Sequence, residues 1–197
     1  MPFTQLQRLI AAFILSSAAV IAQTPAAPPP PHLVGSIAAH PGWPVAKTED
    51  VNSPEAILNA VYSVISGPKG QPRDWNRMRS LFLPDARLIP TLPTAGHADA
   101  IPLTIDGYIA RASAHMAADG FYEHSINNET EQFGNIVQVW STYESRHAAT
   151  DPAPFARGIN SFQILKDNDR YWIVNIFWDA ESPHHPIPAQ YLPNRPH

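Results

Sequence analysis

The feature that most restricts the fold is a change in sequence texture at Gly120. Before this glycine, apolar residues recur every three or four positions, as in amphipathic helices. After it, four segments are rich in β-branched and aromatic residues, as in strands: Phe121–Phe133, Ile136–His147, Phe155–Leu165 and Tyr171–Asp179. Helices that precede strands without alternating with them are typical of an α+β fold, with the helices packed on one face of an antiparallel sheet.

Three helices are predicted before Gly120, and each begins at a residue whose side chain can cap it. They run from the Ser53 cap to Gly67, over Trp75–Phe82 after the Asp74 cap, and from the Thr104 cap to Gly120. A short strand is predicted at Arg87–Pro90, between the second and third helices. The order is therefore helix, helix, short strand, helix and four long strands.

Prolines gather at both ends of the chain and delimit the folded unit. The sequence has 22 prolines, including the run Pro28–Pro31 and several between residues 182 and 197. Because proline lacks a backbone N–H and favours extended chain, such segments do not form a core of their own. We predict a linker or surface arm at 23–50, a folded domain at 51–181 and a Pro-rich tail at 182–197.

The first 22 residues have the pattern of a secretory signal peptide. Met1–Arg8 carries one cation and no acid, and Leu9–Ala22 is apolar or small throughout. This run of about 14 residues is shorter than the roughly 20 residues of a membrane-spanning helix. We predict cleavage after Ala22, a secreted or periplasmic location and no stable membrane insertion of the mature chain. An uncleaved membrane anchor is the alternative.

Composition argues against several classes of function. The chain has no cysteine, which removes disulfides, thiol nucleophiles and cysteine-based zinc sites. Its formal net charge of −4 is opposite in sign to that of nucleic-acid binders, so no nucleic-acid partner is expected. The histidines show neither His-Glu-x-x-His nor His-x-His spacing, and glycine-rich phosphate or dinucleotide loops are missing. We therefore expect no metal and no cofactor.

Three segments carry a resemblance to a known family: DWNRMRSLFLPDARL at 74–88, FGNIVQVWSTYES at 133–145 and RGINSFQILKDNDRYWIVNIFWDAE at 157–181. With the order of elements, they resemble the nuclear-transport-factor-2-like superfamily, and within it exported bacterial SnoaL-like proteins of unassigned activity. The resemblance implies a cone-shaped, curved antiparallel sheet with three N-terminal helices over its concave face, where a blind pocket lies. The known catalytic patterns of the superfamily do not match this sequence residue by residue.

The last two strands suggest which side chains line that pocket. If Asn168 lies in the turn, Asn160 pairs with Asn175, and one face of the two strands is defined by alternation. That face carries Asn160, Phe162, Ile164, Tyr171, Ile173, Asn175, Phe177 and Asp179. We expect it to be concave, so that the two asparagines offer hydrogen bonds to a ligand; the alternative is that they satisfy each other. Phe162, Tyr171 and Phe177 would form the apolar wall.

Two titratable residues are candidates for catalysis. Asp179, placed near the pocket mouth, could be a general base whose pKa is raised by an apolar wall; a rim carboxylate paired with an arginine is the alternative. His124 could shuttle protons near neutral pH if it faces the pocket, and Glu123 would then point to the opposite face. Tyr108 on the third helix and Tyr143 on the second long strand are further candidate ligand contacts.

Three classes of function remain open. The first is binding of an apolar small molecule in the pocket, and the second is a cofactor-free isomerase, dehydratase or cyclase that works by proton transfer. The third is a protein-interaction domain that uses the outer face of the sheet. Trp140, Trp172 and Trp178 are predicted on that outer face. Exposed aromatic clusters usually mark contact surfaces, so we expect either a homodimer through the sheet or packing of the Pro-rich arms there.

Overall fold

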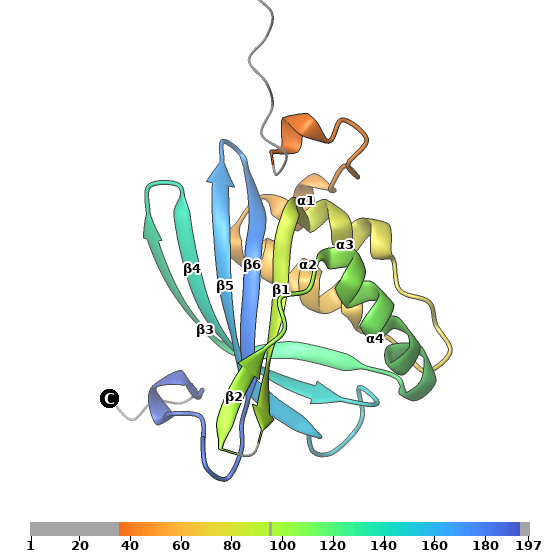
Figure 1. Ribbon diagram of the computed structural model, residues 1–197, viewed down its shortest axis with the longest axis vertical. Coiled ribbons are helices and arrows are strands. Elements are labelled where there is room, and N and C mark those ends of the chain that lie inside the picture. Colours follow the sequence, from red (N-terminus) through yellow and green to blue (C-terminus); the bar gives the residue numbers. More distant parts are fainter. Residues whose placement is uncertain (1–35, 95, 194–197) are drawn as a thin grey trace, which may run out of the picture. The chain divides into compact units, whose positions relative to one another are not determined.

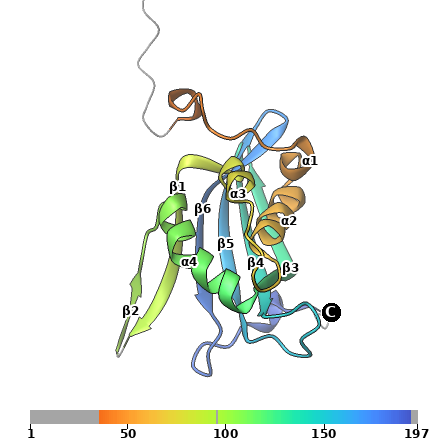
Figure 2. The ribbon, with the colours of Figure 1, turned by 90° about the vertical axis from the view of Figure 1, so that its right-hand side faces the viewer.

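A curved sheet of six strands forms one layer of the molecule, and the helices form the other (Figure 1). The computed structural model describes residues 36–94 and 96–193. The predicted signal segment 1–22, residues 23–35 of the predicted arm and the last four residues of the tail lie outside the described residues. Figure 2 shows the helices on one side of the sheet, over its concave face. This is the predicted α+β architecture, with a sheet that is curved but not closed into a barrel.

The three predicted helices are present, with their caps. They are α2 (Pro54–Ile65), α3 (Trp75–Leu81) and α4 (Ile105–Asp119). The Ser53, Asp74 and Thr104 side chains accept hydrogen bonds from backbone N–H groups of the first turns, at 3.0, 2.9 and 3.0 Å. These bonds satisfy N–H groups that have no partner within the helix. Two 3-10 turns, η1 (Ile37–Ala39) and η2 (Ala189–Tyr191), flank the domain.

The sheet has the strand order β2-β1-β6-β5-β4-β3. The strands are β1 (Phe82–Thr94), β2 (His97–Ala100), β3 (Tyr122–Phe133), β4 (Ile136–Arg146), β5 (Ala156–Asp167) and β6 (Arg170–Ala180). All neighbours pair antiparallel except β1 and β6, which are parallel. β1 is longer than the predicted Arg87–Pro90. The start of β1 was not predicted because Pro84 is unusual within a strand. In the structure, Pro84 lies in the irregular stretch between Phe82 and Arg87, where the regular pairing with β6 is interrupted.

Two strands each contain one extra residue that interrupts the pairing. In β6, Ile173 pairs with Ile164 and Asn175 pairs with Gln163, which leaves Val174 without a partner. In β3, Ser125 pairs with Tyr143 and Asn127 pairs with Thr142, which leaves Ile126 unpaired. Such bulges shift the alternation of side chains on one side of the interruption. Both bulges determine which neighbouring side chains face the candidate site, Glu123 in β3 and Trp178 in β6.

The core lies between α2 and the concave face of the sheet. On α2 the fully buried residues include Ile57 and Leu58, and on the strands they include Val139 and Phe162. The apolar stripe of α2 thus packs against the alternating inward residues of β4 and β5, as its helical spacing predicts. This packing fixes α2 over the sheet and positions Tyr62, whose ring meets that of Phe162 edge-on at 6.2 Å.

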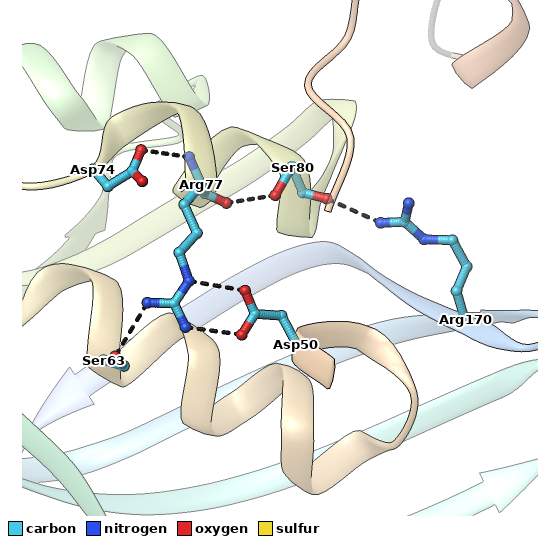
Figure 3. A network of polar contacts seen from close by, with 6 residues as sticks. All are labelled: Asp50, Ser63, Asp74, Arg77, Ser80 and Arg170. Atoms are coloured by element: carbon cyan, nitrogen blue, oxygen red, sulfur yellow. Dashed lines mark hydrogen bonds and ion pairs between the residues drawn. The ribbon is translucent and has the colours of Figure 1, made fainter. Parts of the chain in front are cut away.

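A short helix, α1 (Thr48–Val51), lies at the end of the range predicted as a linker. Its Asp50 is buried and accepts two hydrogen bonds from the Arg77 guanidinium, at 2.8 Å each (Figure 3). The pKa of Asp50 is lowered, mainly by this hydrogen bonding. Arg77 also donates to the Ser63 hydroxyl, so one side chain of α3 joins α1 and α2. Nearby, Arg170 of β6 donates to the Ser80 carbonyl oxygen at 2.9 Å.

The segment after β6 packs on the outer face of the sheet. The Tyr191 ring stacks on Trp140 at 5.5 Å between centroids, and the Thr142 hydroxyl donates to the Tyr191 carbonyl oxygen at 2.7 Å. Ile187 is buried. Part of the outer face is therefore covered by the chain's own Pro-rich tail. Within residues 36–94 and 96–193, no helix combines the length and apolar character needed to cross a membrane.

Candidate functional site

A cavity of about 290 Å³ lies between α2, α4 and the concave face of the sheet. Its walls come from α2, α3, α4 and five strands or their flanking loops. The side chains that line it are Val61, Tyr62, Ile65, Met78, Leu88, Tyr108, Met116, Phe121, Glu123, Tyr143, Ser145, Phe155, Ala156, Asn160, Phe162, Ile176 and Trp178. Most are apolar or aromatic, as in ordinary small-molecule pockets. Its few polar side chains are close together on β3, β4, β5 and α2.

Glu123 is the only ionisable carboxyl that lines this cavity among the described residues. The Ser145 hydroxyl donates to its Oε2 at 2.7 Å, and the Asn160 amide donates to its Oε1 at 3.4 Å. Ser145 is its direct partner in the β3–β4 register. A carboxyl held by two donors in an apolar cavity has a fixed orientation, because any other would leave the donors without partners.

The polar group extends from Glu123 to α2. The Asn160 amide also donates to the Tyr62 hydroxyl at 3.2 Å, and that hydroxyl is 2.6 Å from the Ser141 hydroxyl. Asn160, Ser141 and Tyr62 are all buried. The resulting chain of hydrogen bonds runs from Ser145 through Glu123, Asn160 and Tyr62 to Ser141. It ties the helix to three strands at the wall of the cavity.

The environment of Glu123 favours its protonated form. Burial among apolar walls raises its pKa to about 7, against the weaker opposing effect of the hydrogen bonds from Ser145 and Asn160. No arginine, lysine or histidine is among the side chains that line the cavity in the described part of the chain. The carboxyl therefore changes charge near neutral pH, which is the range where a general acid or base is most useful.

Two more hydroxyls face the cavity, those of Tyr108 on α4 and Tyr143 on β4. Neither makes a hydrogen bond to another of the described residues. Burial raises the pKa of both phenols, with a further contribution from the charge of Glu123. They therefore remain protonated and can donate to a ligand. Tyr108 is fixed by an edge-on contact with Trp178 at 6.3 Å.

The structure brings four of the predicted ligand contacts together at this cavity: Asn160, Phe162, Tyr108 and Tyr143. Tyr171, also predicted, is buried in the core and does not line the cavity. Asn160 points inward as expected. Its predicted pairing with Asn175 is wrong, because Asn160 pairs with Trp178.

Asn175, Phe177 and Asp179 lie on the outer face rather than in the pocket. Up to Ile173 the predicted facing of β6 holds, but the unpaired Val174 shifts the alternation, so that Ile176 and Trp178 point inward. Phe177 and Asp179 are exposed, and Asp179 accepts a hydrogen bond from the Thr91 hydroxyl. They line a second hollow, of about 410 Å³, between the outer face and the C-terminal segment.

His124 is exposed and does not reach the cavity; Glu123 does. Counting back from the turn at Gly134-Asn135 would pair His124 with Ser145. The extra residue Ile126 instead pairs Ser145 with Glu123. The prediction that the two neighbours point to opposite faces is correct, and Glu123 rather than His124 is the one that lines the cavity. The sequence does contain a signal for Glu123, because it is an acidic residue directly after two aromatic residues, Phe121 and Tyr122, at the start of a strand.

No cluster of three or more histidine, aspartate or glutamate side chains suited to a metal ion occurs in the described part of the chain. Beside the cavity, the His147 ring stacks on the lining residue Phe155, with ring centroids 4.2 Å apart. Phe155 is half exposed and also meets Phe121 at 6.2 Å. Phe121 and Phe155 line the cavity, and together with His147 they also line a neighbouring hollow.

Comparison with family models gives no match, and comparison with curated proteins gives none either. Solved structures do match. A protein described as a calcium/calmodulin-dependent protein kinase type II association domain, from Thiobacillus denitrificans, is 16% identical with a TM-score of 0.50. The match covers 66% of this chain and 96% of that one. At this identity the likeness concerns the fold alone.

Two further structures are described as NTF2-like proteins of unknown function. One, from Silicibacter pomeroyi, is 15% identical over 64% of this chain and 92% of its own, with a TM-score of 0.44. The other, from Pseudomonas putida, is 8% identical over 72% and 93%, with a TM-score of 0.49. The curved sheet and the helices over its concave face are the α+β fold that the resemblance found in the sequence implies.

Proposed function

We propose that this protein binds an apolar small molecule in the cavity between helices and sheet, with Glu123 at the polar end. The observation that carries the proposal is the cavity of about 290 Å³ itself, whose walls are apolar except for one connected hydrogen-bond network and the hydroxyls of Tyr108 and Tyr143. A core built for stability alone would fill such a space, since each unfilled volume costs packing energy.

The test is native mass spectrometry of the purified protein for co-purifying small molecules, followed by a thermal-shift screen. We expect a bound compound, and stabilisation by the same compound when it is added back. Ala156→Leu places extra volume at the cavity wall and should weaken binding. Ala149→Leu, at an exposed loop position, is the matched control and should bind as the unaltered protein does. Equal binding by both variants would place the ligand elsewhere.

The second candidate is a cofactor-free enzyme that moves a proton with Glu123 as general base. The pKa of about 7 favours it, because a carboxyl near neutrality can both accept and return a proton. The free hydroxyls of Tyr108 and Tyr143 could donate to the oxygen of an enolate as charge develops there. A direct test is deuterium exchange from solvent into 4-phenyl-2-butanone, followed by NMR. Glu123→Gln should abolish any catalysed exchange while leaving binding of the ketone intact.

Export of the chain is part of the proposal and is supported by the pattern of residues 1–22. Expression of the full chain with a C-terminal tag, followed by fractionation and mass measurement, tests it. We expect a periplasmic or secreted species that begins at Gln23. Leu15→Arg interrupts the apolar run and should keep the protein in the cell at full length.

Self-association through the outer face is a separate proposal about partners. Apolar side chains remain exposed there beside the region that the tail covers: Phe133, Ile136, Val174 and Phe177. Exposed apolar patches of this kind favour contact with another protein surface. Sedimentation of the purified protein should show a dimer that Ile136→Asp dissociates, and a monomer at all concentrations would reject the proposal.

A further inference from the structure

The charged and polar side chains around the cavity indicate the chemistry of its ligand. This inference rests on the proposed function, that the cavity binds a small molecule. Glu123 contributes the only ionisable carboxyl to the lining within the described residues, and no basic side chain lies opposite it. Its two hydrogen-bond donors, Ser145 and Asn160, are neutral. An ionised Glu123 is thus hydrogen-bonded but carries a negative charge that no neighbouring side chain neutralises.

The rest of the lining suits a positive charge. Aromatic side chains reach the cavity from α2, α4, β4 and β6, and include Tyr62, Tyr108, Tyr143 and Trp178. The faces of aromatic rings attract cations, and the attraction is strongest where water is excluded. The free hydroxyls of Tyr108 and Tyr143 can also accept hydrogen bonds. A ligand with several N–H donors can therefore pair with the Glu123 carboxylate and donate to the Tyr108 and Tyr143 hydroxyls in the same cavity.

Other ligand classes fit this arrangement less well. A carboxylate or phosphate would meet the charge of Glu123 without any cation to offset the repulsion. A neutral alcohol or ketone can accept from the tyrosines but, when Glu123 is ionised, leaves its charge uncompensated. An ammonium ion forms a charge-assisted hydrogen bond, which is roughly twice as strong as a neutral one.

We propose that the ligand of this cavity is an organic cation, an apolar molecule ending in an ammonium group that pairs with the Glu123 carboxylate. Its apolar part occupies the space between α4 and β6, against residues such as Met116, Phe162 and Ile176. Binding of the cation favours the ionised carboxyl, so the affinity rises with pH through the range in which Glu123 loses its proton.

The charge of Glu123 acts on three titratable groups of the cavity, Tyr62 on α2, Tyr108 on α4 and Tyr143 on β4. Burial raises the pKa of each, so none of them changes charge between pH 5 and 9. From β5 the facing group is the neutral Asn160. Asp179, on the outer face, acts on Tyr143 and not on Glu123. His147, whose ring stacks on the lining residue Phe155, is also titratable. Because Glu123→Gln keeps His147, comparison with this variant isolates the part of the pH dependence that belongs to Glu123.

Three probes with one apolar frame test the proposal: 3-phenylpropylamine, 3-phenylpropan-1-ol and 3-phenylpropionate. Calorimetry on the full-length protein gives the dissociation constant of each at about pH 8.5 and about pH 5.5, above and below the pKa of Glu123. We expect the amine to bind about tenfold or more tighter than the alcohol at the higher pH, and the propionate to bind weakest. At the lower pH the advantage of the amine should fall toward unity.

Glu123→Gln keeps the size of the side chain and removes the charge, so it should make the amine and the alcohol bind equally at both pH values. Glu131→Gln, an exposed change on the same strand, is the control and should retain the preference. If the alcohol binds as tightly as the amine to the unaltered protein, or the preference survives in Glu123→Gln, the cation is rejected and the binding function stands. If none of the probes binds, the binding function and the cation are both rejected.

Discussion

The Ser145 hydroxyl donates a hydrogen bond of 2.7 Å to Glu123, its direct partner across β3 and β4. This bond stabilises the ionised carboxyl, whereas the apolar surroundings stabilise the protonated one. The pKa of about 7 is the balance of these two effects. A change on either side of the balance should therefore move the pKa in a defined direction.

Removing the hydroxyl by Ser145→Ala should raise the pKa of Glu123 above about 7, because desolvation then acts with less opposition. Carbon-detected NMR titration of the glutamate carboxyl groups measures this shift directly. Ser125→Ala, on the strand that carries Glu123, is the control, since the Ser125 hydroxyl donates to the Asn128 side chain instead. An unchanged or lowered pKa in Ser145→Ala would contradict the assignment.

The raised pKa of Glu123 also predicts how stability varies with pH. The ordinary value of 4.5 applies to the unfolded chain and about 7 to the folded one, so the folded protein holds the proton more tightly. The contribution of Glu123 protonation to the free energy of unfolding is complete below pH 4.5 and is lost as the pH rises through about 7. Glu123→Gln should gain stability relative to the unaltered protein over this range, by on the order of 2–3 kcal/mol.

Urea unfolding at several pH values measures this difference. Glu131→Gln, which is exposed on the same strand, should follow the curve of the unaltered protein. Parallel curves for Glu123→Gln and the unaltered protein would show that Glu123 titrates with its ordinary pKa in the folded state.

The two asparagines should now behave differently. Asn160→Ala removes donors to Glu123 and Tyr62 inside the core and should lower the free energy of unfolding by about 1–3 kcal/mol. Asn175→Ala changes a half-buried residue on the outer face and should cost within about 0.5 kcal/mol. Chemical unfolding of both variants checks this. Similar losses for the two would argue for the regular pairing that sequence alternation suggests.

At the other end of the domain, Asp50→Asn removes the charge that faces Arg77 and should destabilise the protein by about 2 kcal/mol. The pKa of Asp50 is lowered in the folded state, so its contribution is present above the ordinary value of 3.8 and is lost as the pH falls through the folded value. The difference between Asp50→Asn and the unaltered protein should therefore shrink in acid. Glu49→Gln, an exposed neighbour, should change stability little.

The helices could be predicted from the sequence because their signals are local. Ser53, Asp74 and Thr104 each cap the helix that follows within a few residues, and their bonds to the backbone are present. The order of the strands followed from composition and turns, and Asn168 does lie in the last turn, with a positive φ of 51°. The inward facing of Asn160 and Phe162 is predicted correctly because β5 contains no extra residue and its alternation is unbroken.

The candidate base could not be chosen from the sequence because facing depends on an unbroken count. A bulge adds one residue to a strand at a small local cost that no pattern of residue types records. Ile126 and Val174 look like ordinary strand residues, yet each leaves its neighbours out of phase with the partner strand. Beyond Val174, Asp179 lies on the face opposite to the predicted one, and beyond Ile126, His124, a candidate only if it faced the pocket, lies outside it.

The same two interruptions have a consequence for comparing this protein with its relatives. Because Ile126 and Val174 have no partner in β4 and β5 respectively, each could be deleted to leave regular pairing with that strand, in which Glu123 still meets Ser145 and Trp178 still meets Asn160. Evolution can thus shorten either strand by one residue without exchanging the lining of the cavity. A correct alignment of shorter homologues needs gaps in the middle of these strands, where alignment methods normally penalise gaps most.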